Sequence, residues 1–276
     1  MAAVLALAGA LGWGIGDFLG GLAARRLAVL TVLVVSQAVG LVGVYLWVAI
    51  SGDAFPGVAE LLPAAAGGIA ALAGLAALYR GFAIGAMGIV APISAASPIV
   101  PLAVDAARGE TPNAVQWLGI VLVVSGIVVL SREATSGGSR VAAGAGLAVV
   151  AALGFGLFFV GIDAGSDESA AWAVAASRSA SLPVAVVAAL LTATALTTTR
   201  RMFPLVAAVG IFDTGANVLV ALASTRVAIG IVAVLASLYP VTTVVLAWLV
   251  LGERLGASKR IAGAVALGGA ALVAAG

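Results

Sequence analysis

The chain has 276 residues, of which 63% are hydrophobic and 9% are charged, with a formal net charge of +2 and a mean hydropathy of +1.26. Such a chain cannot cover a water-facing surface with polar groups, so it needs lipid as its solvent. The small net charge argues against nucleic-acid binding, and the absence of cysteine and histidine excludes disulfides, His-ligated metals and a Ser-His-Asp triad.

Ten apolar runs are long enough to cross the roughly 30 Å hydrocarbon core of a bilayer. They cover approximately 2–21, 27–50, 61–80, 84–104 and 114–131 in the first half, and 141–162, 170–197, 204–224, 228–250 and 257–275 in the second. The polar stretch 132–140 is typical of a flexible connection between the halves. The sequence therefore predicts an all-α integral membrane protein with ten transmembrane helices.

Short segments of the first half return in the second half at a nearly constant distance. Residues 10–15, Ala-Leu-Gly-Trp-Gly-Ile, return as Ala-Leu-Gly-Phe-Gly-Leu at 152–157, an offset of 142. Gly109-Glu110 returns as Gly252-Glu253, an offset of 143. Duplication of this kind is typical of transporters, in which two related bundles rock about a site between them. Because each half has an odd number of helices, we expect them to form two inverted five-helix repeats.

Several features recur in the same order in both halves. They are Trp13-Gly14 with Phe155-Gly156, Pro98 with Pro240, Gly109-Glu110 with Gly252-Glu253-Arg254, and Gly119 and Gly126 with Gly263 and Gly269. In this arrangement the chain resembles the drug/metabolite transporter (DMT) superfamily, specifically its ten-helix EamA-domain transporters. The resemblance covers two EamA-like units, 1–131 and 141–276. It implies export or exchange of small metabolites, often amino acids, without ATP hydrolysis, and we do not expect an enzyme.

The sequence also bears on the energy source. Lys259 is the only lysine, and no glycine-rich loop ends in Lys-Ser or Lys-Thr, so an ATP-binding P-loop is absent. Small four-helix multidrug members of the superfamily carry a membrane-embedded glutamate in the first helix for proton exchange. Here Trp13 and Phe155 occupy that region and Asp17 is expected near its helix end. We therefore expect neither proton coupling of that kind nor a bound cofactor or metal.

Two ionisable residues fall deep inside predicted helices. A charged side chain at the bilayer centre costs about 2.5 to 3.5 kcal/mol on insertion scales, so it should face a cavity or a partner. Arg178 is expected about 12 Å deep, and Asp213 about 16 Å from the same membrane face. We expect the two to form a salt bridge and at least one of them to be exposed to a cavity.

Two interpretations of this pair stay open. In the first, the salt bridge has only the structural role of joining two helices. In the second, Arg178 binds a substrate carboxylate while Asp213 orients Arg178 or the substrate, or binds the amino group of the substrate. Asn217 lies one helical turn beyond Asp213 on the same face and would extend either arrangement.

Prolines interrupt the fourth helix of each half. Pro92, Pro98 and Pro101 lie in the run 84–104, and Pro240 lies in the run 228–250. A proline inside a helix frees a backbone carbonyl that lipid cannot satisfy, so each break should face protein or water. We expect both helices to bend near Pro98 and Pro240 at the border of a central cavity, either as static kinks or as hinges.

Aromatic and polar side chains complete the predicted cavity. Each aromatic residue taken alone is more often a packing residue or an interface anchor, but together they suit an apolar pocket with a few polar handles. Gln37 falls near the repeat position of Arg178, at an offset of 141. The candidate substrate-binding residues are Trp13, Gln37, Tyr79, Ser94, Ser97, Phe155, Phe159, Arg178, Asp213, Asn217 and Tyr239.

The distribution of basic residues predicts an orientation. The side of the N-terminus carries Arg108 and Arg226, whereas the other side carries ten Lys and Arg residues. The positive-inside rule then places both termini outside the cytoplasm, although the family resemblance implies cytoplasmic termini. The expected location is an inner or plasma membrane, crossed many times.

The sequence therefore predicts a secondary transporter that exports or exchanges small metabolites, with amino acids as the favoured substrates, by alternating access. The alternatives are a membrane-embedded enzyme acting on lipid or prenyl substrates and a flippase for lipid-linked substrates. The expected partners are a small-molecule solute and the lipid bilayer, with no nucleic acid. A monomer is compatible with the sequence, which leaves the oligomeric state open.

Overall fold

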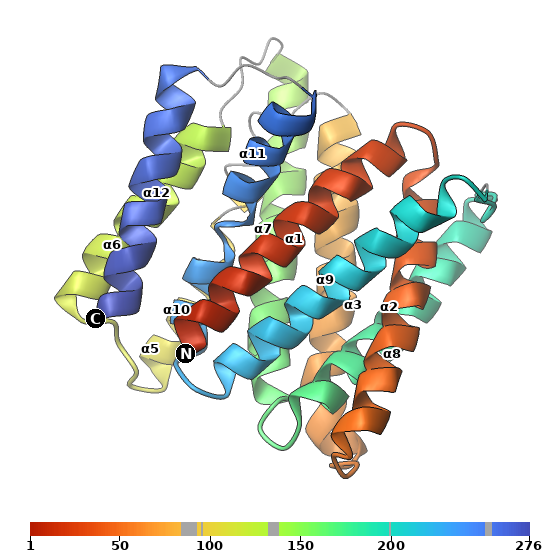
Figure 1. Ribbon diagram of the computed structural model, residues 1–276, viewed down its shortest axis with the longest axis horizontal. Coiled ribbons are helices and arrows are strands. Elements are labelled where there is room, and N and C mark those ends of the chain that lie inside the picture. Colours follow the sequence, from red (N-terminus) through yellow and green to blue (C-terminus); the bar gives the residue numbers. More distant parts are fainter. Residues whose placement is uncertain (84–92, 95, 132–137, 199, 252–255) are drawn as a thin grey trace.

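The computed structural model describes residues 1–83, 93–94, 96–131, 138–198, 200–251 and 256–276. Throughout this part the chain folds into helices and the loops that join them, without a strand (Figure 1). Because lipid offers no hydrogen bonds to the backbone, apolar segments that cross it form helices, which satisfy their own N–H and C=O groups. The predicted all-α class is confirmed.

The helices of the first half are α1 (Ala2–Ala24), α2 (Val29–Ser51), α3 (Val58–Ala83), α5 (Ile99–Ala107) and α6 (Ala114–Ser131). Those of the second half are α7 (Gly138–Ala164), α8 (Ala170–Leu191), α9 (Phe203–Ser224), α10 (Ile229–Ala236), α11 (Tyr239–Leu251) and α12 (Ala257–Ala275). Local signals set several ends. Gly52 ends α2 with a φ of 70°, which favours glycine. The Ser169 hydroxyl caps α8 by accepting a hydrogen bond from the Trp172 backbone N–H.

Seven segments of the described chain are long and apolar enough to cross a membrane. They are Ala2–Ala24, Val29–Ser51, Val58–Leu78, Gly146–Ala164, Ala170–Leu191, Phe203–Ser224 and Ile229–Leu251, and the shorter apolar helices Ala114–Val129 and Arg260–Ala275 accompany them. The chain is therefore a multi-pass membrane protein. Residues 84–92 of the predicted run 84–104 lie outside the described residues, so the count of ten stays a prediction.

The structure corrects the end of one predicted span and interrupts another. The run 170–197 is helical only to Leu191, because the chain turns at Thr192 and Ala193 adopts a positive φ of 51°. The run 228–250 corresponds to one membrane-length segment, Ile229–Leu251, in which a turn at Ser237 and Leu238 separates α10 from α11. Apolar composition predicted both segments but not the end of the first helix at Leu191, whereas Pro240 predicted the interruption of the second.

The helices of the two halves pack against one another in a paired pattern. Contacts of α1 with α9 have their counterpart in α7 with α3, and contacts of α2 with α9 have theirs in α8 with α3. The pairs α2 with α8 and α6 with α12 join helices that hold the same place in each half. In Figure 1, α6 and α12 lie side by side at one flank of the molecule.

Glycines allow these close approaches at equivalent positions. A Cβ atom added at Gly14 would lie 2.7 Å from the Tyr239 carbonyl oxygen, and one added at Gly156 would lie 2.9 Å from the Ser97 carbonyl oxygen. Gly14 and Gly156 are 142 residues apart in the sequence, and so are Ser97 and Tyr239. Small residues at helix crossings let backbones approach closely in membranes. The contacts therefore follow the same register as the repeat in the sequence.

Candidate functional site

A cavity of about 120 Å³ lies between helices of both halves. Its walls come from α1, α2, α3, α7, α8 and α9, together with residues at the breaks next to α5 and α11. The residues proposed from the sequence that line it are Trp13, Gln37, Ser97, Phe155, Phe159, Arg178, Asp213, Asn217 and Tyr239. Ser94 is buried but is not among the lining residues. The side chain of Tyr79 lies outside the described residues.

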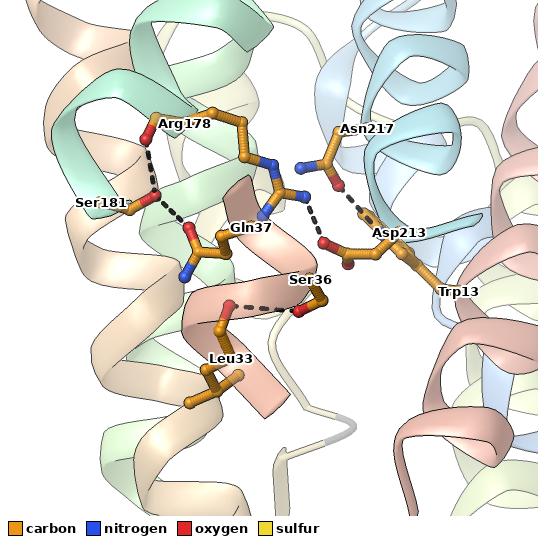
Figure 2. Close-up of polar contacts among 8 residues, drawn as sticks. All are labelled: Trp13, Leu33, Ser36, Gln37, Arg178, Ser181, Asp213 and Asn217. Atoms are coloured by element: carbon orange, nitrogen blue, oxygen red, sulfur yellow. Dashed lines mark hydrogen bonds and ion pairs between the residues drawn. The ribbon is translucent and has the colours of Figure 1, made fainter. Parts of the chain in front are cut away.

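Arg178 and Asp213 form the predicted salt bridge between α8 and α9, through Arg178 Nη2 and Asp213 Oδ2 (Figure 2). Both residues line the cavity, and the Arg178 side chain is 9% exposed against 36% for Asp213. The Arg178 Nε atom is buried and has no hydrogen-bond partner among the described residues. Since a guanidinium carries five N–H donors, this arginine keeps donor capacity beyond its bond to Asp213.

A second polar contact lies beside the salt bridge. The Ser181 hydroxyl donates to Gln37 Oε1 at 2.6 Å, and both side chains are buried (Figure 2). This bond joins α2 to α8, so it holds α8 in register next to Arg178. The neighbouring Ser36 hydroxyl donates to the Leu33 carbonyl of its own helix at 3.2 Å.

Aromatic rings form the other wall of the cavity. Trp13 packs edge-on against Phe158, Phe159 and Tyr239, with ring centroids 6.1, 5.7 and 6.5 Å apart. The Trp13 indole Nε1–H donates to Asn217 Oδ1 at 2.9 Å, which joins α1 to α9 (Figure 2). The ring cluster is edge-to-face, the arrangement that aromatic quadrupoles favour. The cavity thus has an apolar aromatic side and a polar side around Arg178.

The expected helix breaks lie at the border of this cavity. Ser97 precedes Pro98 and α5, and Ser237 and Tyr239 lie at the turn between α10 and α11. These three residues line the cavity. Pro98 itself is buried, and neither proline is a lining residue. The tight i to i+3 backbone bonds at the two breaks recur at an offset of 142: Ala96 N to Ile93 O and Ile99 N to Ala96 O, then Leu238 N to Leu235 O and Val241 N to Leu238 O. The predicted interruptions near Pro98 and Pro240 are confirmed.

Asp17 lies deeper in the bundle than its sequence position suggests. It lines the cavity, although it was expected near its helix end. The reason is that α1 continues to Ala24, so seven residues, or about 10 Å of helix, follow Asp17. One signal could have found it, because Asp17 lies four residues after Trp13 and therefore on the same helix face. Ser177, Ser181 and Ser237 also line the cavity and were not proposed.

A separate charged cluster, Arg108, Asp163 and Asp105, lies at the end of the bundle near the N-terminus and is called the edge cluster below. Arg108, which follows α5, forms a salt bridge of 3.0 Å with Asp163 near the end of α7. The hydrogen bond to this carboxylate raises the pKa of Arg108 above its ordinary value, so the group stays cationic. Asp105 is buried and accepts the Gly230 backbone N–H of α10 at 2.5 Å. The cluster therefore joins α5 of the first half to α7 and α10 of the second.

These features define a polytopic helical membrane protein of the transporter class, with a central cavity bordered by interrupted helices. The model of the EamA-like transporter family matches residues 1–132 and 142–275. The chain therefore belongs to the EamA-like transporter family, as the resemblance in its sequence predicted.

The fold is also that of a solved structure. A protein described only as "Crystal structure of protein" has a TM-score of 0.82 to this chain, with 16% sequence identity, and the match covers 98% of this chain and 95% of that one. At this identity the likeness shows the fold alone. A comparison with curated protein sequences gave no match.

Proposed function

We propose that the chain is a secondary transporter that exports or exchanges small metabolites, with amino acids as the favoured substrates, by alternating access. The observation that carries this proposal is the central cavity, where a buried arginine with an unpaired Nε–H donor faces carboxylates and an aromatic wall. Arginine binds carboxylates through paired donors in a fixed planar geometry. The aromatic side suits the apolar part of the same solute.

The paired contacts of the two halves support alternating access. The contacts of α1 and α2 with α9 have counterparts in those of α7 and α8 with α3, in which the two halves are interchanged. The two helix interruptions are also separated by the offset of 142 residues. We propose on this basis that the halves are inverted repeats of five helices each. In such proteins one bundle rocks against the other around a site held near the repeat interface. The interruptions next to Pro98 and Pro240 would then serve as hinges.

The walls of the cavity favour a solute over a lipid substrate. Lining residues come from α1, α2 and α3 of the first half and from α7, α8 and α9 of the second, which places the cavity within the bundle. A flippase or a lipid-modifying enzyme needs an opening toward the bilayer through which a lipid tail can extend. The cavity's small volume of about 120 Å³ suits a small solute.

We further propose that both termini face away from the cytoplasm. In Figure 1 the N and C labels lie at the lower ends of α1 and α12, whereas the α1–α2 and α8–α9 connections lie at the upper right. Those two connections carry Arg25, Arg26, Arg200 and Arg201, and the positive-inside rule assigns such a side to the cytoplasm. Because the chain has no cysteine, single cysteines at position 26 and at the C-terminus can report orientation. A membrane-impermeant maleimide added to intact cells should label only the C-terminal cysteine, and the reverse pattern would contradict this orientation.

The test of the transport function is substrate exchange in proteoliposomes. Purified protein is reconstituted and loaded in turn with amino acids, organic acids, amines and sugars, and the exchange of labelled solute is measured with and without a pH gradient. We expect saturable exchange of amino acids that exceeds exchange in protein-free liposomes. Rates equal to those of protein-free liposomes for every class would overturn the proposal.

A further inference from the structure

The charges that face the cavity do not balance. Among the described residues, three acidic or basic side chains line it: Asp17 on α1, Arg178 on α8 and Asp213 on α9. Arg178 forms its ion pair with Asp213. Asp17 has neither a hydrogen bond nor an ion pair to any residue that the structure describes. The cavity therefore holds one carboxyl group more than its arginine pairs with, at a depth where an unpaired charge is unfavourable.

The surroundings of Asp17 suit a cation. Gly16, its neighbour in α1, lies next to α9, where a Cβ added to it would be in ordinary contact with the Cβ of Asp213 at 3.8 Å. Trp13, one turn earlier on the same face of α1, and Tyr239 both line the cavity. Carboxylates attract ammonium groups by charge, and indole and phenol rings attract them through their faces.

The complementary half of the site is Arg178. Its side chain is nine-tenths buried, and its Nε–H donor is buried without a partner among the described residues. Such a donor is stabilised when a ligand oxygen accepts its hydrogen bond. The cavity thus presents an unused donor of a cation and an unused carboxylate, which together match a molecule that carries one negative and one positive group.

We propose that Asp17 is the amine-binding residue of the cavity, which binds the ammonium group of a zwitterionic amino acid whose carboxylate is bound by Arg178. Asp213 then positions Arg178 rather than binding the amino group. This inference rests on the proposed transport function and deepens it by assigning the specificity for an amine to one residue. A substrate without an ammonium group would leave Asp17 unpaired, so it should bind more weakly.

The test uses matched ligands that differ only in their charged groups. The probes are leucine, isoamylamine and isocaproate, and phenylalanine, phenethylamine and hydrocinnamate, so that each skeleton occurs as a zwitterion, an amine and an acid. Binding to purified wild-type protein in detergent is measured by calorimetry, together with two variants. Asp17→Asn keeps the shape and removes the charge. Asp167→Asn makes the same change at an exposed position of the α7–α8 connection and serves as the matched control.

For wild type and Asp167→Asn we expect the zwitterion to bind at least tenfold more tightly than the acid of the same skeleton. Asp17→Asn should lose at least tenfold in affinity for the zwitterion and the amine, while its affinity for the acid stays unchanged or rises. Because the substitution removes an unpaired buried charge, the variant should unfold at the same temperature as wild type or higher. Asp17→Glu, which restores a carboxylate, should recover the preference for amines and shows that the effect follows charge rather than folding.

Two results would overturn this proposal, and they are distinguishable. If wild type prefers amino acids and Asp17→Asn binds all three ligand classes as wild type does, the amine site lies elsewhere and the transport function stands. If wild type binds none of the six probes, both the assignment of Asp17 and amino acids as substrates are wrong. An equal loss of all three ligand classes in a folded Asp17→Asn variant would also refute a role in amine recognition.

Discussion

The two charged clusters of the molecule differ in what they leave unpaired. At the edge near the N-terminus, Arg108 pairs with Asp163, and Asp105 accepts the Gly230 N–H. Each of these charged groups has a partner in the protein, although the buried Oδ1 atom of Asp105 has no hydrogen-bond partner among the described residues. Each contact joins α5 to a helix of the second half. In the central cavity, Arg178 pairs with Asp213 but keeps a buried donor, and Asp17 has no described partner. Groups that the fold does not satisfy are available to a ligand.

Burial strengthens this contrast. The Arg108 side chain is 46% exposed, so water screens its salt bridge, whereas the Arg178 side chain is 9% exposed. Electrostatic interactions weaken in the high dielectric of water. The Arg108–Asp163 salt bridge should therefore contribute little to stability and the edge cluster nothing to ligand selectivity, whereas the central cluster should dominate both. The predictions that follow test this division, beginning with the largest effect.

Removal of Arg178 alone should have the largest effect. Arg178→Met leaves Asp213 without its partner inside the bundle, and breaking a buried ion pair costs about 3 to 5 kcal/mol. Asp213 is 36% exposed to the cavity, so we expect the lower end of this range. The measurement is thermal unfolding in detergent, with Arg25→Met, a change at an exposed arginine, as the control.

The double variant Arg178→Met with Asp213→Leu separates the two interpretations of the pair. With both charges removed, folding should return to near the wild-type level. Binding of amino acids and of the matched acids should not return, because the carboxylate site is lost. If the double variant both folds and transports like wild type, the pair has only the structural role of joining α8 to α9.

Loss of the Asp105 contact should have an intermediate effect. Asp105→Ala removes the acceptor for the Gly230 N–H at the start of α10, and loss of a helix-capping acceptor costs about 0.5 to 2 kcal/mol. The free energy of unfolding should fall by that amount in chemical denaturation, and leucine affinity should stay within twofold of wild type. Asp105→Asn, which keeps an acceptor oxygen, should be closer to wild type. A tenfold change in leucine affinity would show that the edge cluster takes part in binding.

Removal of the indole donor of Trp13 should have a smaller effect. Trp13→Phe keeps an aromatic ring in the cavity wall but breaks the 2.9 Å bond to Asn217, and a hydrogen bond of this type contributes about 1 kcal/mol. The matched control is Trp248→Phe, since Trp248 is an exposed residue of α11. Thermal unfolding should distinguish the two variants, and equal melting temperatures would show that the Asn217 contact adds nothing to stability.

Sequence reasoning reached the fold and much of the cavity because both depend on features that the chain carries locally. Apolar length predicted the helices, and the constant offset predicted which helices would hold equivalent places. The Arg178–Asp213 contact followed from matched depths, since few ionisable residues lie deep in the membrane and each needs a partner.

The positions of Asp17, Ser94 and the edge cluster could not be predicted in this way, because they depend on where helices end and on which helix faces meet. Asp17 was assigned to a helix end because the apolar run fades near Gly20 and Gly21, but the helix itself continues to Ala24. The edge cluster escaped notice because Arg108 and Asp163 are 55 residues apart in the chain, and no local pattern relates them. Ser94 was proposed as a polar residue of the proline-containing run 84–104, whereas Ser97, in the turn at positions 96–98, lines the cavity.

The smallest effect should come from the edge salt bridge. Arg108→Gln keeps most of the side-chain length and removes the charge that pairs with Asp163. Exposed ion pairs contribute about 0 to 1 kcal/mol, and salt screens them further. The free energy of unfolding should therefore fall by less than 1 kcal/mol at low ionic strength, and the difference from wild type should vanish in high salt. The matched control is Arg26→Gln, a change at an exposed arginine of the α1–α2 connection. A loss that is large and independent of salt would mean that the edge cluster is held as tightly as the central one, and the contrast between the two regions would fail.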